Sequence, residues 1–155
     1  MFLWRLCELA DAAKAFDGEG ARLYGGRWNH KGTRLVYASS SLALAALECL
    51  VHAEAMLIKR PLFRFRVEVE DAMIEVLAPA QLPANWKDYP APEETRALGS
   101  RWVARGRKAI LSMPSVIVPE ERNYLLNPLH PDFREMTFGK SKPFSFDPRL
   151  RKSER

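Results

Sequence analysis

The clearest pattern in the chain lies in Leu62–Glu70, where apolar and charged residues alternate from Phe63 onward. Phe63, Phe65, Val67 and Val69 alternate there with Arg64, Arg66, Glu68 and Glu70. A period of two predicts a β-strand that buries one face and leaves the other in water. The fold must therefore contain a sheet with a covered face around this segment.

The other predicted elements are shorter strands and two helices. The strands are predicted at Phe2–Leu6, Arg34–Ala38, Met73–Leu77, Ala109–Ser112 and Ser115–Val118. The helices are predicted over Ser41–Met56, with one of the serines 39–41 as N-cap, and over Pro92–Arg105, with Gly106 after the last turn. Strands outnumber helices and do not alternate with them regularly, so we predict an α+β fold.

Length and composition indicate one compact domain. The chain has 155 residues, of which 47% are hydrophobic and 28% charged, as in a globular protein. Two proline-rich stretches, 79–92 and 114–131, are too short to separate two cores. We expect the domain to span residues 1–148 and a basic tail to span residues 149–155.

Several classes of protein are excluded by what the sequence lacks. Two cysteines, Cys7 and Cys49, cannot form a disulfide framework, so a reducing cytoplasm fits best. Three isolated histidines predict no metal site. The apolar run Leu42–Val51 is too short for a membrane helix, and the first residues do not predict a signal peptide. The net charge of +5 suits an anionic ligand, an acidic partner or nucleic acid.

The segment Gly25–Gly32 combines a flexible backbone with hydrogen-bond donors. Its glycines allow close approach to a ligand, and Arg27 offers a planar fork of donors to a phosphate or a ribose. The alternative is a surface turn in which Arg27 is solvated and Trp28 covers the core.

Glu48 lies in the middle of an otherwise apolar helix. A buried carboxylate must be paired, neutral or in a cavity, because an unpaired buried charge costs several kcal/mol. It is therefore either a functional group or one partner of a structural ion pair with an arginine. Cys49 and His52 lie three residues apart on the same helix. Cys49 is either a thiol nucleophile beside His52, or both residues only pack against their neighbours.

Two further candidates lie later in the chain. Ser115 begins a predicted core strand between prolines, and no GxSxG elbow surrounds it, so it is a weak candidate for a nucleophile. Asn123 and Asn127 either bind a ligand amide or hold turns.

Taken together, these segments resemble the RES-domain family, which is named after an arginine, a glutamate and a serine. The likeness covers residues 2–135 and runs through Gly20-Ala21, Gly25-Gly26-Arg27-Trp28-Asn29, Val36-Tyr37-Ala38-Ser39, Ala45-Ala46-Leu47-Glu48, Pro114-Ser115 and Asn123 to His130. The three residues of the family name would be Arg27, Glu48 and Ser115. The resemblance implies the toxin of a toxin–antitoxin pair, with an Xre-type, DNA-binding antitoxin as partner. It also implies a mixed, mostly antiparallel sheet like that of ADP-ribosyltransferase toxins, with NAD as substrate and no metal.

The resemblance also implies roles for single residues. Arg27 would attract the phosphates of NAD, and Tyr37 would stack on the nicotinamide ring. Glu48, kept ionised by Arg27 or by ribose hydroxyls, would stabilise the positive charge that develops on the ribose as the glycosidic bond breaks. Ser115 and Asn123 would be pocket residues.

We therefore expect an enzyme that cleaves the nicotinamide–ribose bond of NAD, with the antitoxin covering the mouth of the cleft. One alternative is the transfer of ADP-ribose to a protein. The other is a basic nucleic-acid-binding module without catalysis. If the chain is a toxin, we expect it to be linked to nucleic acid only through the DNA-binding antitoxin.

Overall fold

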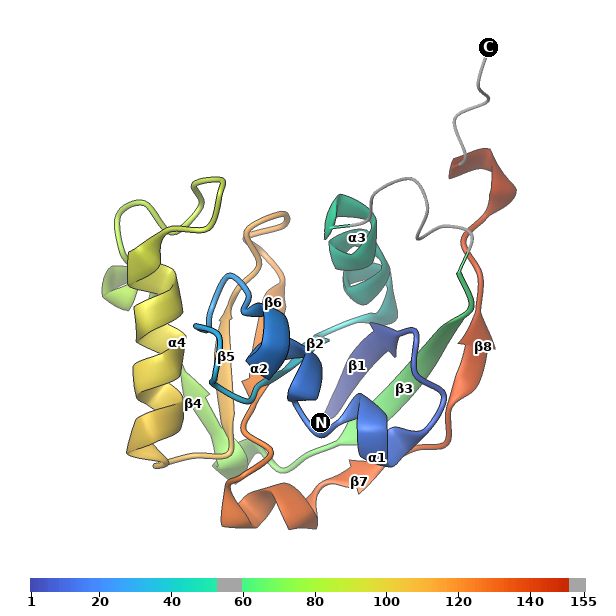
Figure 1. Ribbon diagram of the computed structural model, residues 1–155, viewed down its shortest axis with the longest axis horizontal. Coiled ribbons are helices and arrows are strands. Elements are labelled where there is room, and N and C mark those ends of the chain that lie inside the picture. The colour runs from blue at the N-terminus through green and yellow to red at the C-terminus, as the bar shows by residue number, and fades with distance from the viewer. Residues whose placement is uncertain (53–59, 151–155) are drawn as a thin grey trace.

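The strands of the computed structural model, which describes residues 1–52 and 60–150, form a single sheet (Figure 1). The strands are β1 Phe2–Cys7, β2 Val36–Ser39, β3 Leu62–Glu68, β4 Ile74–Val76, β5 Ile110–Pro114, β6 Arg122–Leu126, β7 Thr137–Phe138 and β8 Lys142–Phe144. The α-helices are α1 Ala12–Ala15, α2 Glu19–Tyr24, α3 Leu42–His52 and α4 Glu93–Arg105. Short 3-10 turns lie at Asp71–Met73, Pro79–Gln81, Pro131–Glu135 and Pro148–Leu150.

The sheet is mixed and mostly antiparallel. Its order is β4-β5-β6-β2-β1-β3-β7, and β8 also pairs with β3. Among the pairings of described strands, β4 with β5 is parallel and the others are antiparallel. The predicted α+β class and the predicted kind of sheet are both confirmed.

The alternating segment forms β3, which pairs with β1, β7 and β8. Phe65 and Val67 are completely buried, while Arg66 and Glu68 are exposed. The guanidinium of Arg66 lies 4.4 Å from the centre of the Phe2 ring, so the polar face is also packed against its neighbour. The strand ends at Glu68, two residues earlier than predicted.

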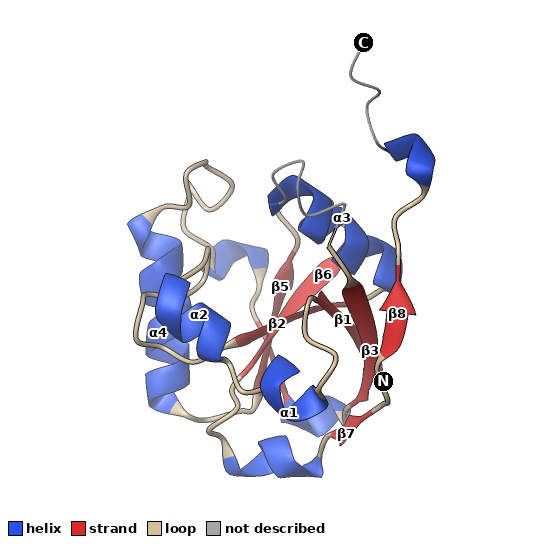
Figure 2. Ribbon diagram, turned by 45° about the vertical axis from the view of Figure 1, so that its right-hand side comes forward, coloured by secondary structure: helices blue, strands red, loops and turns tan. Residues whose placement is uncertain are grey.

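The two long helices cover different parts of the sheet. Figure 2 shows the strands at the centre, with α4 and α2 on the left and α3 at the top. Trp102 of α4 packs into one core cluster with Trp28, whereas Ala45 of α3 packs into another with Leu6 of β1 and Leu62 of β3. No described helix has the length and apolar character needed to cross a membrane.

Both predicted helices are present, and local signals mark the start of α3 and the end of α4. The Oγ of Ser41 accepts a hydrogen bond from the Leu44 N–H, so Ser41 caps α3. The predicted end of α3 at Met56 lies outside the described residues. Helix α4 follows Pro92 and ends at Gly106, whose φ of 58° is the left-handed conformation that glycine adopts most readily.

The predicted strand Ser115–Val118 is wrong. These residues form the connection between β5 and β6, where the Oγ of Ser115 accepts hydrogen bonds from the N–H groups of Ile117 and Val118. A serine that captures nearby backbone donors offers the chain an alternative to a sheet ladder. The strand lies instead at Arg122–Leu126, and the sequence analysis also missed α1 and α2.

Loop 25–32 is held tightly against the helix α4. The N–H of His30 donates to Ser100 Oγ at 3.0 Å, and a His30 ring nitrogen lies 2.7 Å from Glu93 Oε1. Gly99 allows this approach, because a Cβ placed there would lie 1.8 Å from the carbonyl oxygen of Trp28. The backbone of α4 therefore sets the position of the loop that carries Arg27.

Candidate functional site

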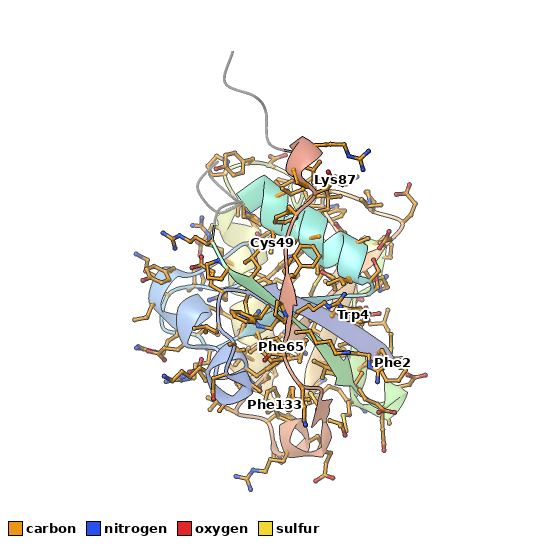
Figure 3. The ribbon with its side chains drawn as sticks, turned by 90° about the vertical axis from the view of Figure 1, so that its right-hand side faces the viewer. Phe2, Trp4, Cys49, Phe65, Lys87 and Phe133 are labelled. Atoms are coloured by element: carbon orange, nitrogen blue, oxygen red, sulfur yellow. The ribbon has the colours of Figure 1, made fainter. Side chains whose placement is uncertain are left out.

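A cavity of about 350 Å³ lies between α3, β1, β2 and loop 25–32. Its walls are formed by Trp4, Arg5, Leu6, Gly25, Gly26, Arg27, Trp28, Tyr37, Ala38, Ser39, Ala45, Glu48, Cys49, His52, Val116 and Asn123. Figure 3 shows Cys49 on α3 and Trp4 on β1, so both the helix and the strand contribute to the wall. The volume lies within the range of ordinary small-molecule sites. We call it the inner cavity.

Glu48 is held in the inner cavity by one of its two carboxylate oxygens. Its Oε1 accepts hydrogen bonds from Ser115 Oγ, at 2.9 Å, and from Asn123 Nδ2. Its Oε2 accepts no hydrogen bond from the described residues, and His52 Nε2 lies 3.9 Å away. The side chain is 21% exposed, so Glu48 is not fully buried and part of it faces the cavity.

Ser115 lies behind Glu48, and its hydroxyl is fully used. It donates to Glu48 and accepts from the N–H groups of Ile117 and Val118, both at 3.1 Å. A hydroxyl has one donor and two acceptor positions, so none remains for a ligand. Ser115 is completely buried and does not line the cavity; we therefore expect it to act on a ligand only through Glu48.

Asn123 is oriented by a residue directly across the sheet. Its Oδ1 accepts from Ser39 Oγ at 2.8 Å, which leaves its Nδ2 to donate to Glu48. Ser39 and Asn123 are register partners in the β2–β6 pairing. The strand register therefore fixes the direction in which this amide points.

Arg27 faces the inner cavity and is fixed by main-chain oxygens. Its Nη1 donates to the carbonyl of Trp86 at 3.0 Å and to that of Asp88 at 2.9 Å. Burial lowers the pKa of Arg27, and the opposing charge of Glu48 counteracts part of this effect. The salt bridges among the described residues include no Arg27–Glu48 pair, so the two side chains line one cavity without direct contact.

The loop around Arg27 is organised by the completely buried Asn29. Its Nδ2 donates to the carbonyls of Ala21, His30 and Thr33, and its Oδ1 accepts from the hydroxyl of Tyr37 at 2.7 Å. Trp28 belongs to the core, as the alternative interpretation of this segment expected. The loop is thus both a packed turn and one wall of the cavity.

Tyr37 lines the cavity while its hydroxyl is engaged elsewhere. The hydroxyl donates to Asn29 and accepts from the Trp28 N–H at 3.2 Å. Burial raises the pKa of Tyr37, so the phenol stays neutral. Because the hydroxyl is occupied, stacking by the ring is the interaction that Tyr37 offers a ligand.

Three further residues line the inner cavity, and the sequence analysis names Cys49 and His52 for their spacing on one helix but not Arg5. Arg5 belongs to β1, and its Nη1 donates to the carbonyl of Tyr37 at 2.9 Å. His52 lies one helical turn beyond Glu48. Cys49 also lines the cavity, but burial raises its pKa to about 11, so at neutral pH it is a thiol and a poor nucleophile. Arg5 has no sequence signal, because it is a single charged residue within an ordinary strand.

The wall carries more positive than negative charge. Arg5 and Arg27 form no salt bridge with a carboxylate among the described residues, and Glu48 is the acidic residue of the wall. Such a cavity favours an anionic ligand. Over residues 1–52 and 60–150, no three His, Cys, Asp or Glu side chains are grouped to hold a metal ion.

Comparison with protein families and with characterised proteins gives a consistent result. The RES domain family matches residues 2–147. A Yersinia enterocolitica protein named "Toxin Res" is 40% identical over 152 residues, covering 97% of this chain and 100% of the relative. A Sphingobium protein named "Prs ADP-ribosylating toxin" is 43% identical over 154 residues, covering 95% of this chain and 94% of the relative.

A solved structure shares the fold. A chain in the crystal structure of the M. tuberculosis MbcT–MbcA toxin-antitoxin complex superposes with a TM-score of 0.76 at 17% sequence identity. The match covers 97% of this chain and 86% of that chain.

Proposed function

The chain belongs to the RES domain family of toxins, and we propose that it acts by cleaving the bond between nicotinamide and ribose in NAD. Water or inorganic phosphate accepts the ADP-ribosyl group. The observation that carries the proposal is the carboxylate of Glu48 beside a cavity that Arg27 also lines. Two donors hold its Oε1, and among residues 1–52 and 60–150 no donor is hydrogen-bonded to its Oε2.

Glu48 supplies the chemistry that this reaction needs. Positive charge develops on the ribose as the C–N bond breaks, and a fixed carboxylate stabilises that charge without having to reorganise. Ordinary glycosidases also need an acid that protonates the leaving oxygen. Nicotinamide takes the electron pair of the broken bond and leaves as a neutral molecule, so one carboxylate is sufficient.

The cationic residues and the aromatic ring suit the remainder of the substrate. NAD carries a pyrophosphate, which Arg27 and the excess positive charge of the wall would attract. The nicotinamide ring is flat and cationic, and the ring of Tyr37 offers it a stacking surface. A test of this part is Arg27→Ala, which we expect to raise the KM for NAD.

The function is tested by incubating the purified chain with NAD and measuring free nicotinamide. We expect one nicotinamide for each NAD consumed. Unchanged NAD at equimolar protein would contradict the proposal. Repeating the reaction with and without inorganic phosphate identifies the acceptor, because phosphorolysis yields a phosphorylated ADP-ribose.

Ser115→Ala tests whether Ser115 positions Glu48. Hydrogen bonds to charged groups contribute about 1.5–3 kcal/mol, so we expect kcat for NAD cleavage to fall about ten- to hundredfold. The KM should change little, because Ser115 does not line the cavity. Steady-state kinetics of nicotinamide release measures both constants.

Ser112→Ala is the matched control for Ser115→Ala. Ser112 is also buried, and its hydroxyl accepts from Arg122 Nε at 2.6 Å, away from Glu48. We expect it to alter stability but not kcat. Equal loss of kcat in both variants would show that Ser115 has only a structural role.

A second candidate function keeps the same site and changes the acceptor. The Sphingobium relative is named as an ADP-ribosylating toxin, which favours a protein as acceptor. NAD labelled in its adenine would then leave the label on a macromolecule in a cell extract. Label recovered only in small molecules would favour cleavage.

We also propose an Xre-type antitoxin that covers the mouth of the cleft. The neighbouring fold was solved as a toxin–antitoxin complex, which supports a protein partner of this kind. Full NAD cleavage by a stoichiometric complex with the antitoxin would contradict it.

A further inference from the structure

A second cavity, of about 370 Å³, adjoins the inner cavity. We call it the outer cavity. It is lined by Arg27, Glu48, Val51, His52, Tyr89, Val116 and Ile117. Arg27, Glu48, His52 and Val116 line both cavities. The two volumes therefore meet at Arg27 and Glu48, to which the proposed function assigns roles.

The outer cavity differs from the inner one in offering an exposed aromatic ring beside aliphatic side chains. Tyr89 is 89% exposed and Val51 is 60% exposed, and Ile117 is partly buried. They come from loop 83–92, from α3 and from the β5–β6 connection, which lie at the same end of the molecule in Figure 1. Single exposed apolar residues are common, but an exposed aromatic ring and two aliphatic side chains that line one hollow are typical of a binding site.

The position of Tyr89 is linked to that of Arg27. The carbonyls that hold Arg27 Nη1 belong to Trp86 and Asp88, and Tyr89 follows directly in the chain. The guanidinium therefore anchors the loop that places the aromatic ring at the mouth. Arg27 therefore lines both cavities and also fixes the loop that carries Tyr89.

We propose that the outer cavity binds the adenine ring of NAD, with Tyr89 stacking on it and Val51 and Ile117 beside it. The inference rests on the proposed function. NAD consists of two nucleotide halves joined by a pyrophosphate. With nicotinamide beside Tyr37, the pyrophosphate passes Arg27 and the adenine reaches the outer cavity. Stacking of a base on an aromatic side chain is a strong and common contact.

The test compares NAD with nicotinamide mononucleotide, which keeps the scissile bond and one phosphate but lacks the adenosine half. We expect the wild-type chain to show at least a tenfold higher kcat/KM for NAD. Tyr89→Ala should lower kcat/KM for NAD about tenfold, mainly through KM, and leave nicotinamide mononucleotide unchanged. Tyr89→Trp should preserve the preference.

Tyr24→Ala is the matched control, because Tyr24 is 79% exposed and lines neither cavity. It should behave as wild type towards both substrates. Equal use of the two substrates by the wild type, or an equal loss on both in Tyr89→Ala, would overturn the adenine site while leaving NAD cleavage intact.

A binding measurement separates this proposal from the proposed function. ADP contains the adenine half and no scissile bond. Calorimetry should show ADP binding to the wild type and to Tyr24→Ala, with at least tenfold weaker binding to Tyr89→Ala. This result supports the adenine site even if no nicotinamide is released, and equal ADP binding to all three proteins rejects it.

Discussion

Glu48→Gln should lower nicotinamide release about a hundred- to thousandfold while the fold remains intact. The amide keeps the shape of the side chain but loses the negative charge that faces the developing cation. Removing one preorganised electrostatic group from an active site has an effect of this size. The KM for NAD should change little, because the proposed function assigns binding to Arg27 and to the stacking surfaces. Steady-state kinetics measures the loss, and circular dichroism verifies the fold.

Glu121→Gln is the control for this substitution. Glu121 also accepts hydroxyl hydrogen bonds, from Ser40 at 3.4 Å and from Ser41 at 3.0 Å, but it lines neither cavity. It should retain wild-type turnover. Turnover by Glu48→Gln within a few-fold of wild type would exclude Glu48 as the catalytic carboxylate.

Gly99→Ala should produce the largest loss of stability. The added Cβ would lie 1.8 Å from the Trp28 carbonyl oxygen, and backbone atoms on both sides leave no side chain that could rotate away. Overpacking typically lowers the free energy of unfolding by about 1–3 kcal/mol, and we expect the upper end because the clash is with backbone atoms. Urea denaturation should show a lower midpoint. NAD cleavage should fall as well, because Arg27 directly precedes Trp28.

Gly20→Ala provides the opposite expectation from the same chemical change. Gly20 lies within α2, and a Cβ there would meet no atom within 4 Å. Alanine favours the helix by roughly 0.5–1 kcal/mol over glycine, so the midpoint should stay equal or rise. If both variants unfolded at the wild-type midpoint, the close contact between α4 and loop 25–32 would be absent.

The elements that sequence analysis predicted are those with signals in their own residues. The alternation that forms β3 reports which face is buried, and Ser41 and Gly106 mark helix ends through local hydrogen bonds and backbone conformation. The segment after β5 has the composition of a strand, but it forms a loop because of the hydrogen bonds that Ser115 makes. Its hydroxyl takes two backbone donors while also serving Glu48, which a pattern of apolar residues does not reveal.

In the candidate site, too, the sequence reveals the residue types but not the contacts between distant segments. Residue types alone singled out Arg27 and Glu48, but the sequence interpretation expected Arg27 or the substrate to keep Glu48 ionised. In the structure the donors to Glu48 are Ser115 and Asn123, and Arg27 is held by carbonyls about 60 residues away in the chain. Tyr89 is an ordinary loop residue in the sequence. Only the folded arrangement places it beside Arg27.

The donors that hold Glu48 follow it in the chain by 67 and 75 residues. Asn123 reaches Glu48 only when β6 has joined β2 in the correct register, since a slip by one residue would turn its side chain to the other face. When α3 has been synthesised, the two donors that orient Glu48 are therefore not yet part of the chain. Under the proposed function, NAD cleavage therefore begins only after the β2–β6 part of the sheet has formed.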